Sequence, residues 1–285
     1  MKTLSRIIGA LLLVLLAGCS AVQTGYNNAP TLLYWWLDAY IDFEDAQDRP
    51  VRDSLEALQT WHRRQELPAY AALLQRLQQQ APEAVTPEQV CAHLAQARVH
   101  LQGLGEQGAE GLARLAPTLQ AGQLRHLARQ FEKHNQKWRS EWLDGTPVEL
   151  RERRLERAVD RYEDFYGRLS ETQKTLLRQR IAASSFDARL AWAERLRRQQ
   201  DILGALQEHR NGDRPAHVKA EMLALVQRSL EPPEPAARAQ FESMLLEGCQ
   251  TIAALHNSAS EAQRRRLIER LRGYAADLQA LIAPG

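Results

Sequence analysis

Residues 85–89 read Val85-Thr86-Pro87-Glu88-Gln89, and an Ala-, Leu-, Gln- and Arg-rich run follows them to Gln102. The hydroxyl of Thr86 can accept a hydrogen bond from the backbone N–H of Gln89, and the Gln89 side chain can reach back to the Thr86 N–H. Proline suits a first helical turn because its missing N–H would be unpaired there anyway. The residues that follow favour helices. This stretch therefore predicts a helix over 86–102.

The same start recurs along the chain. Leu169-Ser170-Glu171-Thr172-Gln173 repeats it closely, and Ala259-Ser260-Glu261-Ala262-Gln263 is a weaker copy. Thr146-Pro147-Val148-Glu149 is a variant with glutamate. Two further stretches, 43–47 and 119–123, keep only the apolar residue and the glutamine. Each such cap stabilises a helix by about 1 kcal/mol, so the motif is fully accounted for as a helix start.

The whole chain after its N-terminus is typical of an all-α protein. Leu, Ala, Gln, Arg and Glu dominate, and no alternating strand pattern with hairpin turns is present. We predict a multi-helix bundle of about ten to twelve helices within residues 30–285, with a glycine-rich loop at 103–111 and a candidate subdivision near 211–235. The expected helices are 30–46, 50–66, 68–80, 86–102, 106–115, 118–143, 147–167, 170–182, 186–210, 215–230, 235–255 and 259–282, many of them beginning near a proline such as Pro50 or Pro68.

Residues 1–18 have the form of a cleaved signal peptide. Lys2 and Arg6 precede an apolar run, residues 7–17, that is shorter than the roughly 20 residues of a membrane-spanning helix. The run ends in Leu-Ala-Gly18-Cys19, which resembles the lipobox of bacterial lipoproteins. The resemblance implies cleavage between Gly18 and Cys19, lipid on the Cys19 thiol, and a lipidated tether over 19–29. Ser20 follows the cysteine, and by resemblance to lipoprotein sorting rules this favours the periplasmic face of the outer membrane.

The charge balance argues against a nucleic-acid partner. The chain has 37 Lys and Arg against 35 Asp and Glu, and removal of Lys2 and Arg6 leaves 35 against 35. A nearly neutral mature protein lacks the net basic field that nucleic-acid binding requires. The sequence also contains no zinc-protease, nucleophile-elbow, phosphate-loop or Cys-x-x-Cys motif, so we expect no catalytic residues, metal or cofactor.

Two cysteines remain after Cys19. Cys91 and Cys249 could form a disulfide in an exported protein, or they could be two buried free thiols, and the sequence does not choose between these alternatives.

Two groups of residues are candidates for an interaction surface. Trp35, Trp36 and Tyr40 belong to an aromatic-rich helix, which either docks on the bundle or meets lipid headgroups or a partner near the anchor. In the charge-dense segment 149–161, the side chains of Arg153, Arg157 and Arg161 share one helix face. That stripe is either a solvated, salt-bridged surface or a clamp for an acidic partner.

Two family resemblances accompany these patterns. The Leu-Ser-x-x-Gln start at 169–173 resembles the Leu-Thr-x-x-Gln repeats of the Spy and CpxP periplasmic proteins, which are small helical chaperones and stress modulators. A longer resemblance runs through 25–29 (Gly-Tyr-Asn-Asn-Ala), 35–40 (Trp-Trp-Leu-Asp-Ala-Tyr) and 61–70, and matches an uncharacterised family of proteobacterial lipoproteins, defined only as a domain of unknown function. It implies an all-helical envelope lipoprotein and no catalytic residues.

These patterns favour a non-enzymatic lipoprotein of the cell envelope that binds other proteins or unfolded clients. A Spy-like holdase or stress modulator is the most concrete version of this hypothesis. The alternative is an enzyme acting on peptidoglycan or lipid, which would need a deep cleft with convergent carboxylates or a histidine of shifted pKa.

Overall fold

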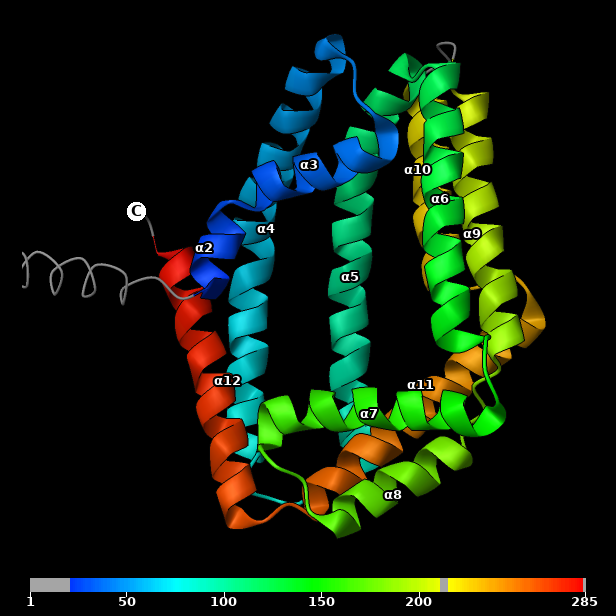
Figure 1. The fold of residues 1–285 in the computed structure, drawn as a ribbon. Coiled ribbons are helices and arrows are strands. Elements are labelled where there is room, and N and C mark those ends of the chain that lie inside the picture. Colours follow the sequence, from blue (N-terminus) through cyan, green and yellow to red (C-terminus); the bar gives the residue numbers. More distant parts are fainter. Residues whose placement is uncertain (1–20, 211–214, 284–285) are drawn as a thin grey trace, which may run out of the picture.

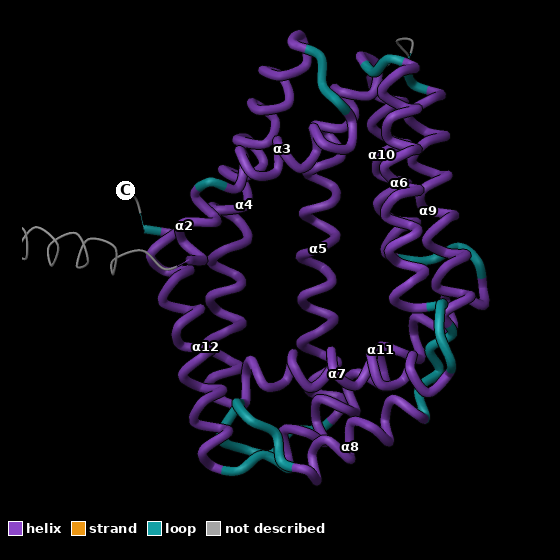
Figure 2. The backbone as a smooth tube through the Cα atoms, viewed as in Figure 1, coloured by secondary structure: helices purple, strands orange, loops and turns teal. Residues whose placement is uncertain are grey.

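The computed structural model describes residues 21–210 and 215–283. Within these ranges the chain forms eleven α-helices, a short 3-10 turn and no strand (Figure 2), which confirms the predicted all-α class. No helix among the described residues is long and apolar enough to cross a membrane. The helices are α2 (Ala21–Asn27), α3 (Ala29–Ile41), α4 (Asp45–Gln80), α5 (Pro87–Leu115), α6 (Ala121–Trp142), α7 (Pro147–Tyr166), α8 (Glu171–Ala182), α9 (Ala188–Glu208), α10 (Pro215–Leu230), α11 (Pro235–Asn257) and α12 (Glu261–Ile282), with the 3-10 turn at Ala116–Thr118.

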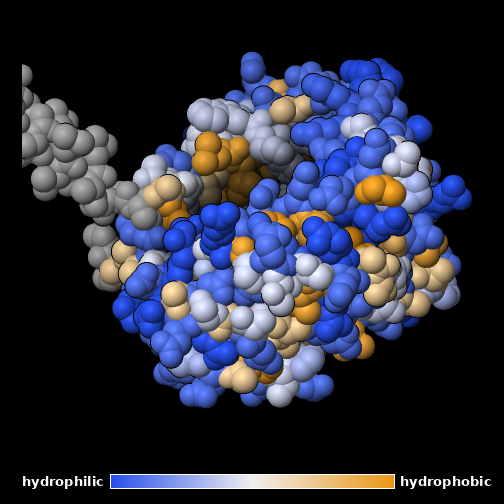
Figure 3. Space-filling model, turned by 60° about the horizontal axis from the view of Figure 1, so that its bottom comes forward, coloured by the Kyte–Doolittle hydropathy of each residue, from blue (hydrophilic) through white to orange (hydrophobic). Residues whose placement is uncertain are grey.

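The other helices form a frame around the central helix α5 (Figure 1). Helix α12 packs along α4 on one side, and α6, α9 and α10 form the opposite side. Helices α7, α8 and α11 cross the lower end, while α3 packs against both α4 and α6 across the upper part. Helix α5 runs between the two sides and contacts α4, α10 and α11. Figure 3 shows that the molecular surface is hollowed on one face and that apolar residues line the walls of this hollow.

Two main apolar clusters hold the frame together. The larger joins α3, α5, α6, α9 and α10 around Leu127, Leu206 and Met222. The second joins α7, α8, α11 and α12 around Leu177 and Leu255. Because each cluster is built from helices far apart in the sequence, the core depends on long-range packing rather than on any single hairpin of helices.

Helix α4 is longer than the sequence predicts. The helices expected at 50–66 and 68–80 are wrong as separate elements, because one helix runs from Asp45 to Gln80 with Pro50 and Pro68 inside it. An interior proline removes a backbone hydrogen bond and costs about 3 kcal/mol in an isolated helix. Leu67 and Ala71, on either side of Pro68, are nevertheless buried, so packing keeps the helix continuous through the proline.

The glycine-rich loop predicted at 103–111 is also wrong, since α5 is helical through all of it. A Cβ atom on Gly105 would lie 2.5 Å from Cγ1 of Val226 in α10, and one on Gly111 would lie 3.3 Å from Cβ of Ser54 in α4. These glycines therefore allow close approach of neighbouring helices and do not end the helix.

The N-terminal segment departs from prediction at two points. The expected tether over 19–29 is already helical from Ala21, and α2 packs on α12, where Gln23 donates to Asp277 at 2.9 Å. The helix expected at 30–46 ends at Ile41, because Asp42 adopts a left-handed conformation with φ of 62°. Aspartate is one of the few residues that tolerates this conformation.

The predicted capping motif does more than begin helices. Thr86, Thr146, Ser170 and Ser260 each accept a hydrogen bond from the backbone N–H three residues on, and the Gln or Glu at that position reaches back. The sequences at 43–47 and 119–123 form the same box, with Glu44 and Gln120 as the N-cap residues.

Four of these motif glutamines also pair across helices. The amides of Gln173 and Gln263 donate to one another's carbonyl oxygens at 3.0 and 2.9 Å and so join the starts of α8 and α12. Gln47 and Gln123 do the same for α4 and α6, at 3.3 and 2.7 Å. The motif thus joins helix starts in pairs, and buried amides of this kind specify the pairing because an unsatisfied partner is costly.

A buried histidine makes stability depend on pH. His256 lies between Tyr166, whose hydroxyl is 3.0 Å from Nδ1, and the carbonyl oxygen of Glu83, 2.9 Å from Nε2. Burial lowers the pKa of His256 below its ordinary value of 6.5, although the Glu83 carbonyl partly opposes this. The unfolded chain therefore binds the proton more readily than the folded one, and stability is lost as pH falls below 6.5.

We accordingly expect the urea concentration at the midpoint of unfolding to decrease when the pH is lowered from 7.5 to 5. His256→Asn should reduce this dependence but not abolish it, since burial also lowers the pKa of His62 and His93. A midpoint that rises on acidification, or a pH dependence identical in the variant, would contradict this explanation.

Candidate functional site

An open groove lies at the corner of the frame where the end of α6 faces α9 and the first half of α11. Aromatic rings form one wall. The ring of Trp138 stacks on Trp192 of α9 with centroids 5.4 Å apart and on Trp142 at 6.2 Å. Trp142 in turn meets the edge of Phe186 at 5.6 Å. Because Trp138 and Trp142 are four residues apart on α6, both rings project from the same face of the helix.

Helix α11 forms the opposite wall and contributes flexible and aromatic apolar side chains. Phe241 and Met244 line the groove and are 37% and 38% exposed, which is high for large apolar residues. The enclosed space is about 430 Å³. We call this part the aromatic groove, and define it by Trp138, Trp142, Phe186, Leu190, Phe241 and Met244.

A basic lobe continues from the aromatic groove, with which it shares Trp142, Phe186 and Met244. It encloses about 370 Å³ between α7, α8 and α11. We call it the arginine lobe and define it by Arg154, Arg157, Arg161 and Arg180. Two of these guanidinium groups lie over aromatic rings, Arg157 at 4.5 Å from the Trp142 centroid and Arg154 at 4.7 Å from that of Phe186. Such cation–π contacts hold the charges at the junction of the two parts.

The arginine lobe carries an excess of positive charge. Arg157 is paired with Glu141 at 3.1 Å. Within the described ranges, no carboxylate lies within 4 Å of the guanidinium groups of Arg154, Arg161 or Arg180. Burial lowers the pKa of Arg154, with Glu247 opposing the shift, but an arginine stays protonated at neutral pH. The lobe therefore presents cations that an anionic ligand could neutralise.

Among the described residues, Glu247 is the one acid that lines the arginine lobe, and it already has hydrogen-bond partners. Burial would raise its pKa, but the backbone N–H of Ser185, the side chains of Ser184 and Ser185, and the charge of Arg154 together lower it below 4.5. Its carboxylate accepts from the Ser185 N–H at 2.8 Å. Glu247 thus holds the loop that carries Phe186 and stays ionised at neutral pH.

The turn between α6 and α7 positions the groove. Gly145 has φ of 133°, a conformation that L side chains rarely adopt, and the Thr146–Glu149 capping box follows directly. Arg153 turns back toward this bend and donates to the carbonyl oxygen of Asp144. The turn therefore sends α7 across the end of the frame (Figure 1), with Arg154 and Arg157 facing α11 across the lobe.

The structure separates the predicted interaction residues. Arg157 and Arg161 lie in the arginine lobe, whereas Arg153 belongs to the α6–α7 bend, so the predicted three-residue stripe is split. Trp35 and Trp36 lie on α3 outside the groove.

Tyr40 is the most enclosed of the predicted aromatic residues. Its ring is half-buried and stacks on His134 of α6 with centroids 5.2 Å apart. Gly18 and Cys19, the predicted cleavage and lipidation residues, lie outside the described residues.

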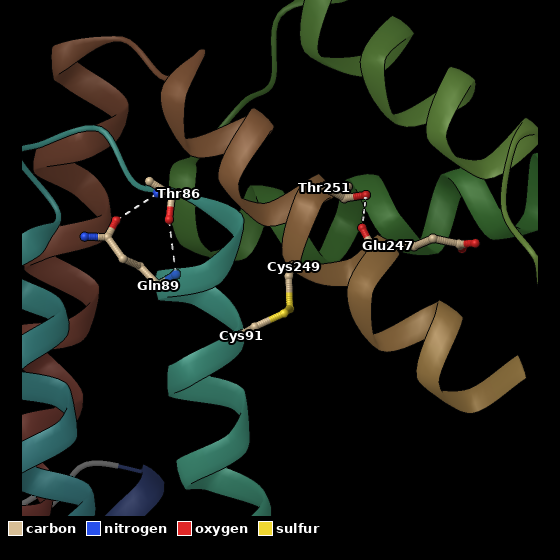
Figure 4. The surroundings of a disulfide bond; sticks show 6 residues. All are labelled: Thr86, Gln89, Cys91, Glu247, Cys249 and Thr251. Atoms are coloured by element: carbon tan, nitrogen blue, oxygen red, sulfur yellow. Dashed lines mark hydrogen bonds between the residues drawn. A yellow bond between two sulfur atoms is a disulfide. The ribbon is translucent and has the colours of Figure 1, made fainter. Parts of the chain in front are cut away.

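Cys91 and Cys249 are joined by a disulfide in the structure, with Cα atoms 5.4 Å apart (Figure 4). The bond links the first turns of α5 to the middle of α11 and lies beside the capping box of Thr86 and Gln89. Because α11 also carries Phe241 and Met244, the disulfide fastens one wall of the aromatic groove to the central helix.

Sequence reasoning did not identify most of the groove. Trp138 and Trp142 have the i,i+4 spacing of a shared helix face, which was an available signal. Arg154 and Arg180 gave none, because nothing local distinguishes them from the other arginines of their helices. Met244 and Phe186 come from segments that meet only in the tertiary fold.

A second cluster links α2, α4 and α5 but does not line the groove. The hydroxyl of Tyr26 is 3.0 Å from Nδ1 of His62, and the ring of Tyr70 meets both His62 and His100. His100 contacts the buried carboxylate of Glu66 at 2.7 Å. This cluster fastens α2 to the α4–α5 pair.

Three comparisons with known proteins bear on identity. A search of curated proteins and a search of solved structures each returned no match. A family model described as "Family of unknown function (DUF6279)" matches residues 39–230, which is more than half of the chain and includes α4 to α10. The predicted membership of a family of unknown function is thereby confirmed, and the chain belongs to the DUF6279 family.

Proposed function

We propose that this protein is a lipid-anchored protein of the periplasmic face of the outer membrane that binds segments of other polypeptides without chemically altering them. The lipobox-like stretch ending at Cys19 supports the anchor, and Ser20 supports the outer-membrane location. The observation that carries the binding function is the aromatic groove joined to the arginine lobe.

The residue types of this site are those of a protein-binding surface. Aromatic residues, methionine and arginine are enriched where proteins bind one another, and Met adapts its shape to varied partners. Phe241 and Met244 remain over a third exposed although they are large and apolar, so they gain from being covered. The groove is open to solvent, which suits binding of an exposed chain segment.

Charge indicates which segments fit. A segment with large apolar side chains next to acidic ones would place the former in the aromatic groove and the latter among Arg154, Arg161 and Arg180. Since no carboxylate among the described residues lies within 4 Å of these three guanidinium groups, an acidic side chain could form charge-assisted hydrogen bonds to them without breaking an ion pair. This pattern suits unfolded clients and favours the holdase form of the hypothesis.

The direct test uses the chain from Ser20 onward, which contains every described helix. It is mixed at near-equal molar ratio with a chemically unfolded client, and aggregation is followed by light scattering. We expect strong suppression, weaker at high salt because the arginine contacts are screened. No suppression across several acidic and neutral clients would overturn the proposal.

Trp142→Ala should weaken client binding by about tenfold or more, because a buried aromatic anchor at an interface contributes about 2 kcal/mol. The measurement is the concentration of protein that halves client aggregation. Leu246→Ala is the matched control, since Leu246 is an exposed apolar residue of α11 that does not line the groove. Circular dichroism must show both variants folded, and equal effects of the two substitutions would contradict a role for the groove.

A further inference from the structure

Helices α2 and α3 are almost free of charge. Residues 21–41 contain one charged side chain, Asp38, in a chain of which 25% of residues are charged. No arginine or lysine lies in either helix. The remaining helices carry acidic and basic residues throughout, so this segment is adapted to surroundings other than water and the polar bundle surface.

Helix α3 is buried on one side and apolar on the other. Tyr34 and Ile41 face inward, and the Tyr34 ring lies under the guanidinium of Arg52, 3.5 Å away. The outward side carries Leu32, Trp35 and Trp36, which are 49%, 59% and 56% exposed, and Leu33 beside them is exposed as well. The expectation that this helix simply docks on the bundle thus describes only its inner side.

We infer that the outward face of α3 lies in the headgroup region of the lipid bilayer that holds the protein, an inference that rests on the lipid anchor of the proposed function. Cys19 precedes the start of α2 by only two residues, which reach at most about 7 Å. The bilayer must therefore lie next to α2, and α3 follows it after a single residue, Asn28.

The chemistry of this face fits a neutral membrane interface. Tryptophan is enriched at the level of the headgroups, where its apolar ring is buried while its N–H group can still donate a hydrogen bond. Asp38, the one acid, is turned from this face and accepts from the backbone N–H of Phe43 at 2.9 Å. Because α2 and α3 contain no basic residue, membrane contact would not depend on anionic lipid. It would come from burial of Leu32, Trp35 and Trp36.

Contact through α3 would also fix the orientation of the domain on the membrane. An acyl anchor alone permits the domain to pivot, whereas a second contact through α3 defines which side faces the lipid. The aromatic groove is lined by residues of α6, α9 and α11, and none of the exposed residues of α3 lines it, so it stays open while the bilayer is bound.

The test uses the non-lipidated chain from Ser20 onward and neutral phosphatidylcholine vesicles, with co-flotation as the readout. We expect the wild-type chain to float with the vesicles. The double variant Trp35→Ala, Trp36→Ala should bind the vesicles at least about tenfold more weakly. Val99→Ala with Leu101→Ala is the matched control, because both residues are exposed and apolar but lie on α5. The control should bind as the wild type does.

Three outcomes would overturn the inference: no flotation of the wild type, equal loss in the control, or a wild-type dimer, seen by analytical ultracentrifugation without lipid, that the tryptophan variant abolishes. The last result would make a second copy of the chain the occupant of this face. Client protection by the same proteins distinguishes the two proposals. If the tryptophan variant loses vesicle binding but still suppresses aggregation, both proposals are supported. If the wild-type chain floats with the vesicles but does not suppress aggregation, the result counts against the groove alone.

Discussion

Replacing both Cys91 and Cys249 with alanine is expected to lower the free energy of unfolding by about 2–5 kcal/mol. The disulfide joins residues 158 positions apart, so it removes a large amount of conformational freedom from the unfolded chain. Cys249 is fully buried between α5 and α11, and its small side chain leaves little void when shortened to alanine. The loss of stability should therefore come mainly from the missing bond.

Urea unfolding followed by circular dichroism measures this effect. The wild-type protein under reducing conditions should behave like the double variant, and the variant itself should not respond to reductant. An unchanged midpoint in the variant, or a reductant effect that persists in it, would contradict the bond as the source of stability. Because α11 carries Phe241 and Met244, we also expect client binding to weaken in parallel.

Gln173→Ala should cost about 2–3 kcal/mol of stability, which is large for a single polar side chain. The substitution removes the hydrogen bond from the Ser170 N–H, worth about 1 kcal/mol as part of a cap. It also removes the two amide–amide hydrogen bonds with half-buried Gln263, whose Nε2 keeps its bond to the Arg168 carbonyl, and this loss costs about a further 1–2 kcal/mol.

Gln89→Ala provides the matched control for this substitution. Gln89 completes the same capping box at the start of α5, but its side chain is exposed and pairs with no second glutamine. We expect a cost of about 1 kcal/mol there, measured by the same urea titration. Equal costs at the two positions would show that pairing between helix starts adds nothing to capping.

Local signals in the sequence predicted the helix starts well. Thr86, Ser170 and Ser260 each combine a side-chain acceptor with a Gln three residues on, and this chemistry acts within a single turn. The pairing of Gln173 with Gln263 could not be predicted, since it depends on two segments 90 residues apart meeting in the fold.

Proline and glycine misled the prediction for a physical reason. Pro68 and Gly105 have unfavourable propensities for a helix interior, but propensity is a weak term beside tertiary packing. Leu67 and Ala71 are buried around Pro68, and Gly105 admits Val226 of α10. A single sequence does not reveal which breakers lie against a neighbouring helix.

The candidate site was predictable only in part. Arg157 and Arg161 were singled out by their spacing on one helix face, and both line the arginine lobe. Arg153 has the same spacing, yet it is drawn to the Asp144 carbonyl by the bend that precedes α7. The aromatic groove could not be predicted without the tertiary fold, because Trp142, Phe186 and Met244 come from three different segments.

The most direct test of the central claim places a photoreactive amino acid at Phe241, inside the aromatic groove, and separately at Leu246, on the opposite side of the same helix. Each protein is illuminated with an unfolded client, and crosslinked client is measured. Binding in the groove predicts crosslinks at position 241 that exceed those at position 246 several-fold and that diminish when Arg154 and Arg161 are both replaced by glutamine. Equal crosslinking at the two positions, or crosslinks only at 246, would contradict it.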